Sequence, residues 1–103
     1  MQGKKFRLPR NKISEFCTRW GITEFSLFGS VLREDFRPDS DIDVLVNIDP
    51  SAHIGLLELA QMQIELENIF KRPVDLVEKD ALRNPYRRSE ILKTAQVIYA
   101  ASG

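Results

Sequence analysis

Apolar and polar residues alternate along the chain with two different periods, which predict a succession of helices and strands. Residues 11–20 carry apolar side chains at helical spacing, with Asn11 as the N-cap and Gly21 as the residue that ends the helix. The next segment, Ile22–Phe28, is rich in β-branched and aromatic residues and is typical of a strand. The pattern therefore predicts a helix followed directly by a strand.

The longest periodic stretch spans residues 51–70, and we expect it to be a helix capped by Ser51. Arg72 and Pro73 end this helix, because a residue that precedes proline avoids helical backbone angles. Two sets of apolar residues recur at helical spacing along the stretch: Ile54, Leu57, Ala60 and Ile64, and Leu56, Leu59, Leu66 and Ile69. We expect most of these side chains to belong to the core and part of them to form an interface.

Shorter apolar stretches predict the remaining strands. Residues 41–46 and Val74–Glu78 have strand composition, and residues 96–99 are apolar enough to form a last strand. Residues 31–40 are expected to contain one helical turn and then a turn-forming segment. Asn84-Pro85 opens a further helix, since proline is tolerated in a first helical turn.

The order of these elements predicts a small α/β (α+β) domain in which helices flank a mixed β-sheet. At 103 residues and 43% hydrophobic, the chain fits one domain over residues 1–103. We expect residues 1–9 to be a loose basic lead-in. A domain of this size buries a modest core, so a partner subunit would add stability.

Composition excludes several classes of protein. Fifteen basic and fifteen acidic residues balance, which disfavours direct binding to nucleic acid, although one basic group is present at Arg83, Arg87, Arg88 and Lys93. One cysteine (Cys17) and one histidine (His53) make neither an internal disulfide nor a cysteine–histidine zinc site. No apolar run approaches the ~20 residues that span a bilayer, and no signal peptide is recognisable. We expect a cytoplasmic protein without a membrane partner.

Three aspartates lie in segments that otherwise resemble buried strands. Asp41 and Asp43 alternate along one predicted strand, so their side chains project from the same face with Cα atoms about 6–7 Å apart. Asp75 stands inside the apolar strand Val74–Glu78. Like charges this close need a cation, a basic partner or a raised pKa. Three strand-borne carboxylates suit Mg²⁺, and two such ions can clamp an in-line phosphoryl displacement. The opposite face of the first strand is expected to pack on the long helix through Ile42, Val44 and Val46.

A candidate triphosphate site precedes these carboxylates. Gly29 allows close approach of the backbone to an anion, and Ser30 adds a hydroxyl donor. Arg33 lies about one helical turn further on, where it is either a phosphate clamp or a surface residue.

Gly29-Ser30, ten residues, and then Asp41-Ile42-Asp43 match the G-S-x10-D-x-D signature of the polymerase-β-like nucleotidyltransferase superfamily. Residues 27–33 (LFGSVLR) and 40–46 (SDIDVLV) together resemble its minimal nucleotidyltransferase (MNT) subfamily. Residues 73–77 and the segment from Asn84-Pro85-Tyr86 to Ile98-Tyr99 extend the resemblance, which covers essentially residues 10–100.

The resemblance implies a polymerase-β-like fold and a role for each matching residue. Asp41 and Asp43 would hold two Mg²⁺ ions, and Asp75 would be the third ligand and the activator of the acceptor hydroxyl. The nucleotide, ATP, would be bound by Gly29, Ser30, Arg33 and Ser40.

The same family includes antitoxins that silence HEPN-type RNase toxins by adding AMP to a toxin tyrosine. The resemblance therefore implies an Mg²⁺-dependent AMP transferase and antitoxin with a HEPN-type partner. No acceptor half-site is evident, so the acceptor arrives on another chain or a second copy completes the site as a homo-oligomer. Two alternatives stay open, namely an antitoxin that inhibits its partner by occlusion alone and nucleotidyl transfer to a small molecule.

Overall fold

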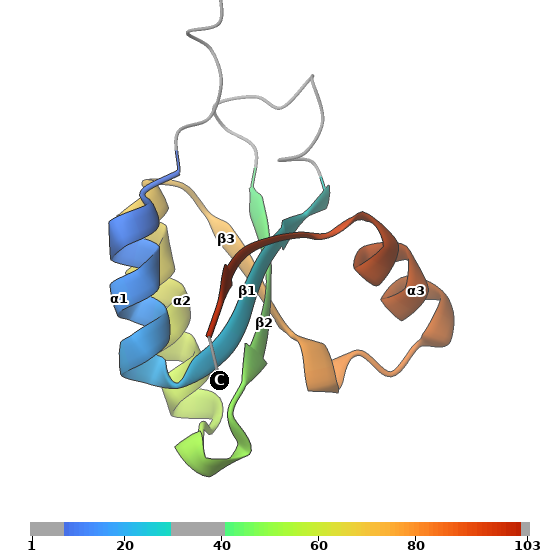
Figure 1. Cartoon of the computed structure of the whole chain (residues 1–103), viewed down its shortest axis with the longest axis horizontal. Helices are drawn as coiled ribbons and strands as arrows, with labels where there is room; N and C mark the ends of the chain where they lie inside the picture. The colour runs from blue at the N-terminus through green and yellow to red at the C-terminus, as the bar shows by residue number, and fades with distance from the viewer. Residues whose placement is uncertain (1–7, 30–40, 102–103) are drawn as a thin grey trace, which may run out of the picture.

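The structure, a computed structural model, describes residues 8–29 and 41–101 of the chain. Three α-helices and a four-stranded sheet are formed by these residues (Figure 1). The helices are α1 (Arg10–Trp20), α2 (Leu56–Phe70) and α3 (Pro85–Thr94), and two short 3-10 turns are η2 (Pro50–Ala52) and η3 (Lys79–Ala81). The strands are β1 (Ile22–Phe28), β2 (Ile42–Ile48), β3 (Val74–Glu78) and β4 (Gln96–Ala100).

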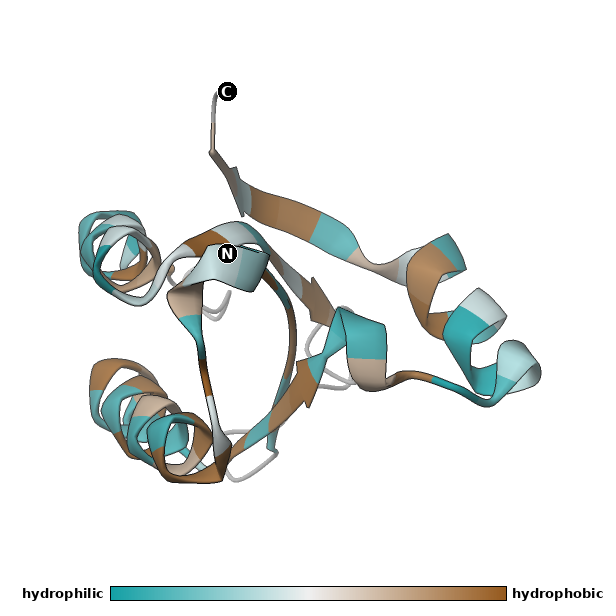
Figure 2. Ribbon diagram, turned by 90° about the horizontal axis from the view of Figure 1, so that it is seen from below, coloured by the Kyte–Doolittle hydropathy of each residue, from teal (hydrophilic) through white to brown (hydrophobic). Residues whose placement is uncertain are grey.

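The sheet is mixed and has the strand order β3-β2-β1-β4. β1 pairs antiparallel with both β2 and β4, whereas β2 and β3 run parallel. Helices α1 and α2 lie on one side of the sheet and α3 lies on the other (Figures 1 and 2). The predicted small mixed sheet with flanking helices is therefore confirmed, including the last strand.

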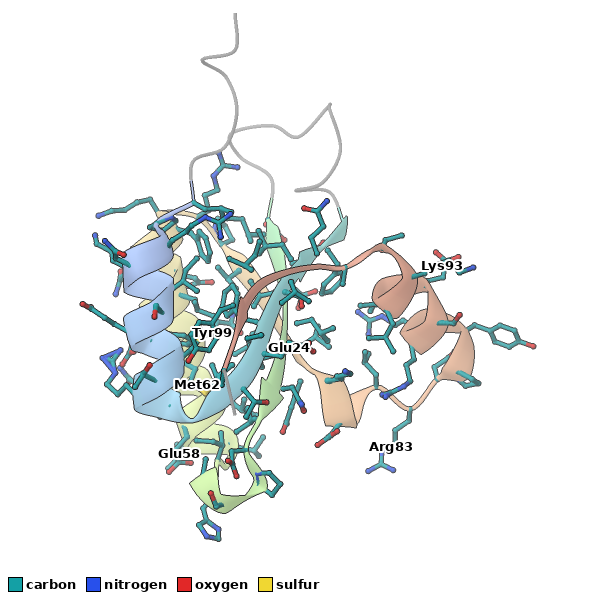
Figure 3. All side chains as sticks on the ribbon, viewed as in Figure 1. Glu24, Glu58, Met62, Arg83, Lys93 and Tyr99 are labelled. Atoms are coloured by element: carbon teal, nitrogen blue, oxygen red, sulfur yellow. The ribbon has the colours of Figure 1, made fainter. Side chains whose placement is uncertain are left out.

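The main core lies between the sheet and the helices α1 and α2. Alternate residues of β2 are fully buried there, as the strand period requires: Ile42, Val44 and Val46. They pack in one cluster with Met62 and Leu66 of α2, which confirms the expected contact between this strand and the long helix (Figure 3 labels Met62). A smaller cluster on the other face packs α3 on the sheet through Phe28, Leu45, Leu82 and Ile91.

Helix α2 begins four residues later than predicted, because its N-cap is Gly55 and not Ser51. The Asp49 carboxylate accepts hydrogen bonds from the backbone N–H and the hydroxyl of Ser51, which stabilises the turn η2 instead of a helical cap. His53 then adopts a left-handed conformation (φ 52°), which interrupts the helical path. Helix α2 starts after Gly55, whose backbone N–H donates to the Glu58 carboxylate.

Fewer apolar residues of α2 are buried in the core than the sequence pattern predicts. Its buried face consists of Met62, Leu66 and Phe70, whereas Leu56, Leu57 and Ile64 are 85%, 84% and 53% exposed. The expectation that most of the ladder belongs to the core is wrong for these three side chains. Periodicity identifies an amphipathic helix, but a broad apolar face leaves the orientation of the helix undetermined.

Element boundaries differ elsewhere by one or two residues. α1 starts at Arg10 without a side-chain cap, so Asn11 is its second residue, and Gly21 ends it in the left-handed conformation as predicted. β2 starts one residue after Asp41 and continues to Ile48. The turns predicted for residues 31–40 lie outside the described residues. Within the described ranges, no helix has the length and apolar character needed to cross a bilayer.

Candidate functional site

Two of the three predicted carboxylates are direct neighbours across the sheet. Asp43 and Asp75 are register partners in the parallel pair β2–β3, at the end of the sheet where both strands begin (Figure 1). Because Ile42 and Val44 point into the main core, Asp43 faces the opposite side, which α3 partly covers. Asp75 shares that side, since its neighbour Val74 belongs to the main core. Asp43 is half-buried and Asp75 is exposed.

Gly29 lies directly against the Asp43 carboxylate. β1 ends at Phe28, the register partner of Asp43, and Gly29 follows with a φ of +75°. A Cβ built on Gly29 would lie 2.1 Å from Asp43 Oδ2, which is too short for a non-bonded contact between carbon and oxygen. Glycine is therefore favoured here by the backbone conformation, and a larger residue would also have to displace the Asp43 carboxylate. The sequence pattern indicated the glycine but not this second reason, which depends on the register between β1 and β2.

Asp41 lies one residue before β2 and is exposed. Its position relative to the sheet is held by the next residue, because the Ile42 N–H donates to the carbonyl of Pro73, just before β3. Across residues 8–29 and 41–101, no three aspartate, glutamate, histidine or cysteine side chains are arranged so that they could hold a metal ion. The backbone thus brings Asp43 and Asp75 together, and their oxygen atoms suit Mg²⁺, but the side chains do not form a complete three-carboxylate ligand set.

The remaining predicted site residues are not part of the described structure. Ser30, Arg33 and Ser40 fall between residues 30 and 40, outside the described ranges. Their assignment to the triphosphate stays a prediction. The described end points of this segment, Gly29 and Asp41, both lie at the same end of the sheet as Asp43.

The basic residues in and just before α3 have two different environments. Arg88 donates from its guanidinium to the carbonyl oxygen of Lys79 at 3.0 Å, and the Lys79 ammonium lies 3.5 Å from the Glu24 carboxylate of β1. These contacts connect α3, η3 and the sheet, so Arg88 has a structural role. Arg83 and Lys93 are exposed and point away from the sheet (Figure 3), and the basic group is not one continuous phosphate site.

Comparison with known proteins gives matches over most of the chain. The family model described as "Nucleotidyltransferase domain" matches residues 10–98. The protein adenylyltransferase MntA of Thermococcus cleftensis is 36% identical, over 82% of this chain and 81% of the relative. A solved structure provisionally described as a minimal nucleotidyltransferase is 33% identical and superposes with a TM-score of 0.71, covering 84% of this chain and 86% of that one.

A more distant structural match is a complex. It contains a tri-AMPylated HEPN toxin of Shewanella oneidensis and an MNT antitoxin, and it matches with a TM-score of 0.65 and 17% identity, over 89% of this chain and 70% of that one. At this identity the match shows the fold alone. The range matched by the family model includes every described strand that positions Gly29, Asp43 and Asp75.

Proposed function

This chain belongs to the nucleotidyltransferase domain family, and from that premise we propose that it moves AMP from ATP to a tyrosine hydroxyl of a separate HEPN-type protein. The observation that carries the proposal is the contact between the glycine and the carboxylates of the signature. Gly29 makes room for Asp43, and Asp43 is paired in register with Asp75. A protein that only occludes its partner has no need of such an arrangement.

The division of roles within this site rests on the signature that these residues match, since the described side chains form no complete ligand set. Asp41 and Asp43 would hold two Mg²⁺ ions, with Asp75 as a further ligand, and the ions would stabilise the charge that develops on the phosphoryl oxygens. Asp75 is exposed, so it is open to an acceptor that approaches from solvent. We assign the triphosphate to the segment from Gly29 to Ser40, through Ser30 and Arg33.

The proposed reaction forms one bond to the α-phosphorus and breaks another, and Asp75 takes up the proton that is released. The acceptor oxygen attacks the α-phosphorus of ATP in line with the bond to the β-phosphate, and that bond breaks. Asp75 accepts the proton of the acceptor hydroxyl, and pyrophosphate carries away the bonding electron pair. The products are an adenylylated hydroxyl and pyrophosphate.

Relatives support a protein acceptor. The T. cleftensis relative is named a protein adenylyltransferase, and the S. oneidensis complex contains an AMPylated HEPN toxin beside its antitoxin. An acceptor on a separate chain agrees with a described structure in which Asp75 is exposed at an open end of the sheet.

Intact-mass spectrometry tests the proposal. A HEPN-type toxin such as that of the S. oneidensis complex, or a HEPN-type protein from the source organism of this chain, is purified, incubated with this chain and Mg-ATP, and weighed. We expect a gain of one or more AMP units that is lost with Asp43→Asn and kept with Asp80→Asn, the same chemical change at an exposed aspartate of η3. A partner that is bound and inhibited without a change in mass would establish the occlusion mechanism instead.

A further inference from the structure

Strand β3 has one neighbour in the sheet of the described residues and so has an open edge. The backbone N–H of Val74 donates to Glu67 Oε2 of α2 at 3.2 Å, so it points away from β2. Backbone groups alternate in direction along a strand, which directs the N–H groups of Leu76 and Glu78 to the same outer side. At Leu76 and Glu78 this edge is able to accept another strand, whereas the Val74 N–H is already bound to α2.

A groove of about 340 Å³ follows the open edge of β3. Leu76 and Val77 of the strand line it, together with Leu59 and Ala60 of α2 and Leu82 after η3. Gln63 and Glu78 line it as well, so the groove has apolar and polar walls that come from three parts of the fold. On α2 these walls continue toward Leu56, which is one turn before Leu59 and Ala60 and is 85% exposed.

Arg87 is a lining residue of this groove. Unlike Arg88, whose guanidinium is bound to the Lys79 carbonyl, Arg87 has no carboxylate within ion-pair distance in the part of the chain that the structure describes. Glu78 also lines the groove, so its walls carry one basic and one acidic side chain. An acidic side chain on a bound segment would pair with Arg87.

The groove is continuous with the proposed site. Asp75 immediately precedes Leu76 on the same strand. A segment paired with β3 advances about 3.3 Å per residue. One or two residues beyond the groove, it would therefore reach the Asp75 carboxylate.

From these four observations we infer that the open edge of β3 and its groove bind the acceptor-bearing segment of the partner protein as an extended, added strand. The segment has apolar side chains at alternate positions for the groove, an acidic side chain for Arg87, and the acceptor hydroxyl at Asp75. Strand addition supplies affinity through backbone hydrogen bonds and specificity through the pockets for alternate side chains. The inference rests on the proposed function, because it names the docking site of the proposed acceptor.

Two pairs of variants test the groove. Arg87→Glu reverses the charge at the groove, and Arg83→Glu makes the same change at an exposed residue that does not line it. Ala60→Glu fills the groove, and Asn68→Glu adds the same side chain to an exposed position of α2 outside it. Binding to the same HEPN-type protein is measured by calorimetry without nucleotide, and AMP transfer is measured separately at increasing partner concentration.

We expect both groove variants to raise the dissociation constant and the KM for the partner about tenfold or more, with little change in kcat. The two control variants should match the wild type. Backbone amide exchange, followed residue by residue by NMR, should slow at Leu76 and Glu78 when the partner binds, which a contact through side chains alone would not cause.

The outcomes separate the two proposals. Wild-type affinity in both groove variants, or unchanged amide exchange at Leu76 and Glu78, would overturn the docking site and leave the transferase activity intact. Weakened binding without any AMP transfer by the wild type would support the docking site and overturn the proposed function. If the wild type does not bind the HEPN-type protein at all, both proposals are wrong.

Discussion

Substitution of Gly29 by alanine should distinguish two effects at this position. One is the contact with the Asp43 carboxylate, and the other is the left-handed backbone conformation. The built Cβ lies 2.1 Å from Asp43 Oδ2 and 3.1 Å from its Cγ, so the Asp43 side chain or the end of β1 must move. Gly21 is the matched control, because it has nearly the same φ, +74°, at the other end of β1. A Cβ on Gly21 would meet only the Cβ of Ala52, at 3.0 Å, which is tight but far from the carboxylates.

The magnitudes follow from these contacts. A left-handed backbone costs a non-glycine residue roughly 1–2 kcal/mol, and alanine recovers about 0.4–1 kcal/mol by restricting the unfolded chain. Both variants should therefore lower the free energy of unfolding by about 1 kcal/mol. Gly29→Ala should also displace the Asp43 carboxylate by an ångström or so, and a displacement of that size lowers the catalytic rate about a hundredfold.

Urea unfolding and AMP transfer to the HEPN-type protein measure the two effects. We expect similar losses of stability in both variants and a loss of kcat/KM in Gly29→Ala alone. If Gly29→Ala transfers AMP at the wild-type rate, the Asp43 carboxylate is not positioned by this contact. If Gly21→Ala loses as much activity as Gly29→Ala, the loss reflects backbone strain and the argument from the carboxylate is refuted.

Three further changes test the site and the core. Asp43→Asn should abolish AMP transfer while leaving the folded protein as stable as wild type or slightly more so by urea unfolding, because it removes a negative charge beside Asp75; more than a tenth of wild-type turnover would contradict the assignment. Met62→Ala should lower the free energy of unfolding by about 2–5 kcal/mol, since Met62 is fully buried, whereas Leu57→Ala should have little effect at an 84% exposed position; equal losses would mean that α2 is rotated. Burial raises the pKa of the Cys17 thiol to about 12, so iodoacetamide should label Cys17 at pH 8 only in denaturant; rapid labelling of the folded protein would show that this face of α1 is not packed into the main core.

The strands were predictable from sequence because their residues alternate between faces with very different environments. Ile42 and Val44 must face the main core, and this alone determines that Asp43 faces the other way. The pairing of Asp43 with Asp75 was not predictable in the same manner. It depends on the parallel register of β2 and β3, which the intervening helix α2 sets by its length and packing.

The start of α2 shows the limit of local patterns. Ser51 has the chemistry of a helix cap. In the structure, however, its N–H and hydroxyl both donate to the Asp49 carboxylate and form a turn, which the local sequence favours equally well. The exposure of Leu56 and Leu57 was beyond sequence reasoning for a different reason. Apolar residues at helical spacing indicate that one face of a helix is buried. The same spacing arises whether that face packs on the protein's own sheet or on a partner.

The topology explains why the residues of the signature differ in how easily they are recognised. Gly29 directly follows β1, and Asp43 lies in β2, the antiparallel neighbour of β1, so the pairing of these two strands places the glycine beside the carboxylate. Asp75 reaches the same point through a parallel crossover that includes the whole of α2, and such a connection tolerates changes of length. A short spacing motif can therefore identify the glycine and the first carboxylates, whereas the third requires the fold. The same crossover leaves β3 at the edge of the sheet, so the strand that supplies Asp75 is also the strand that an incoming partner can reach.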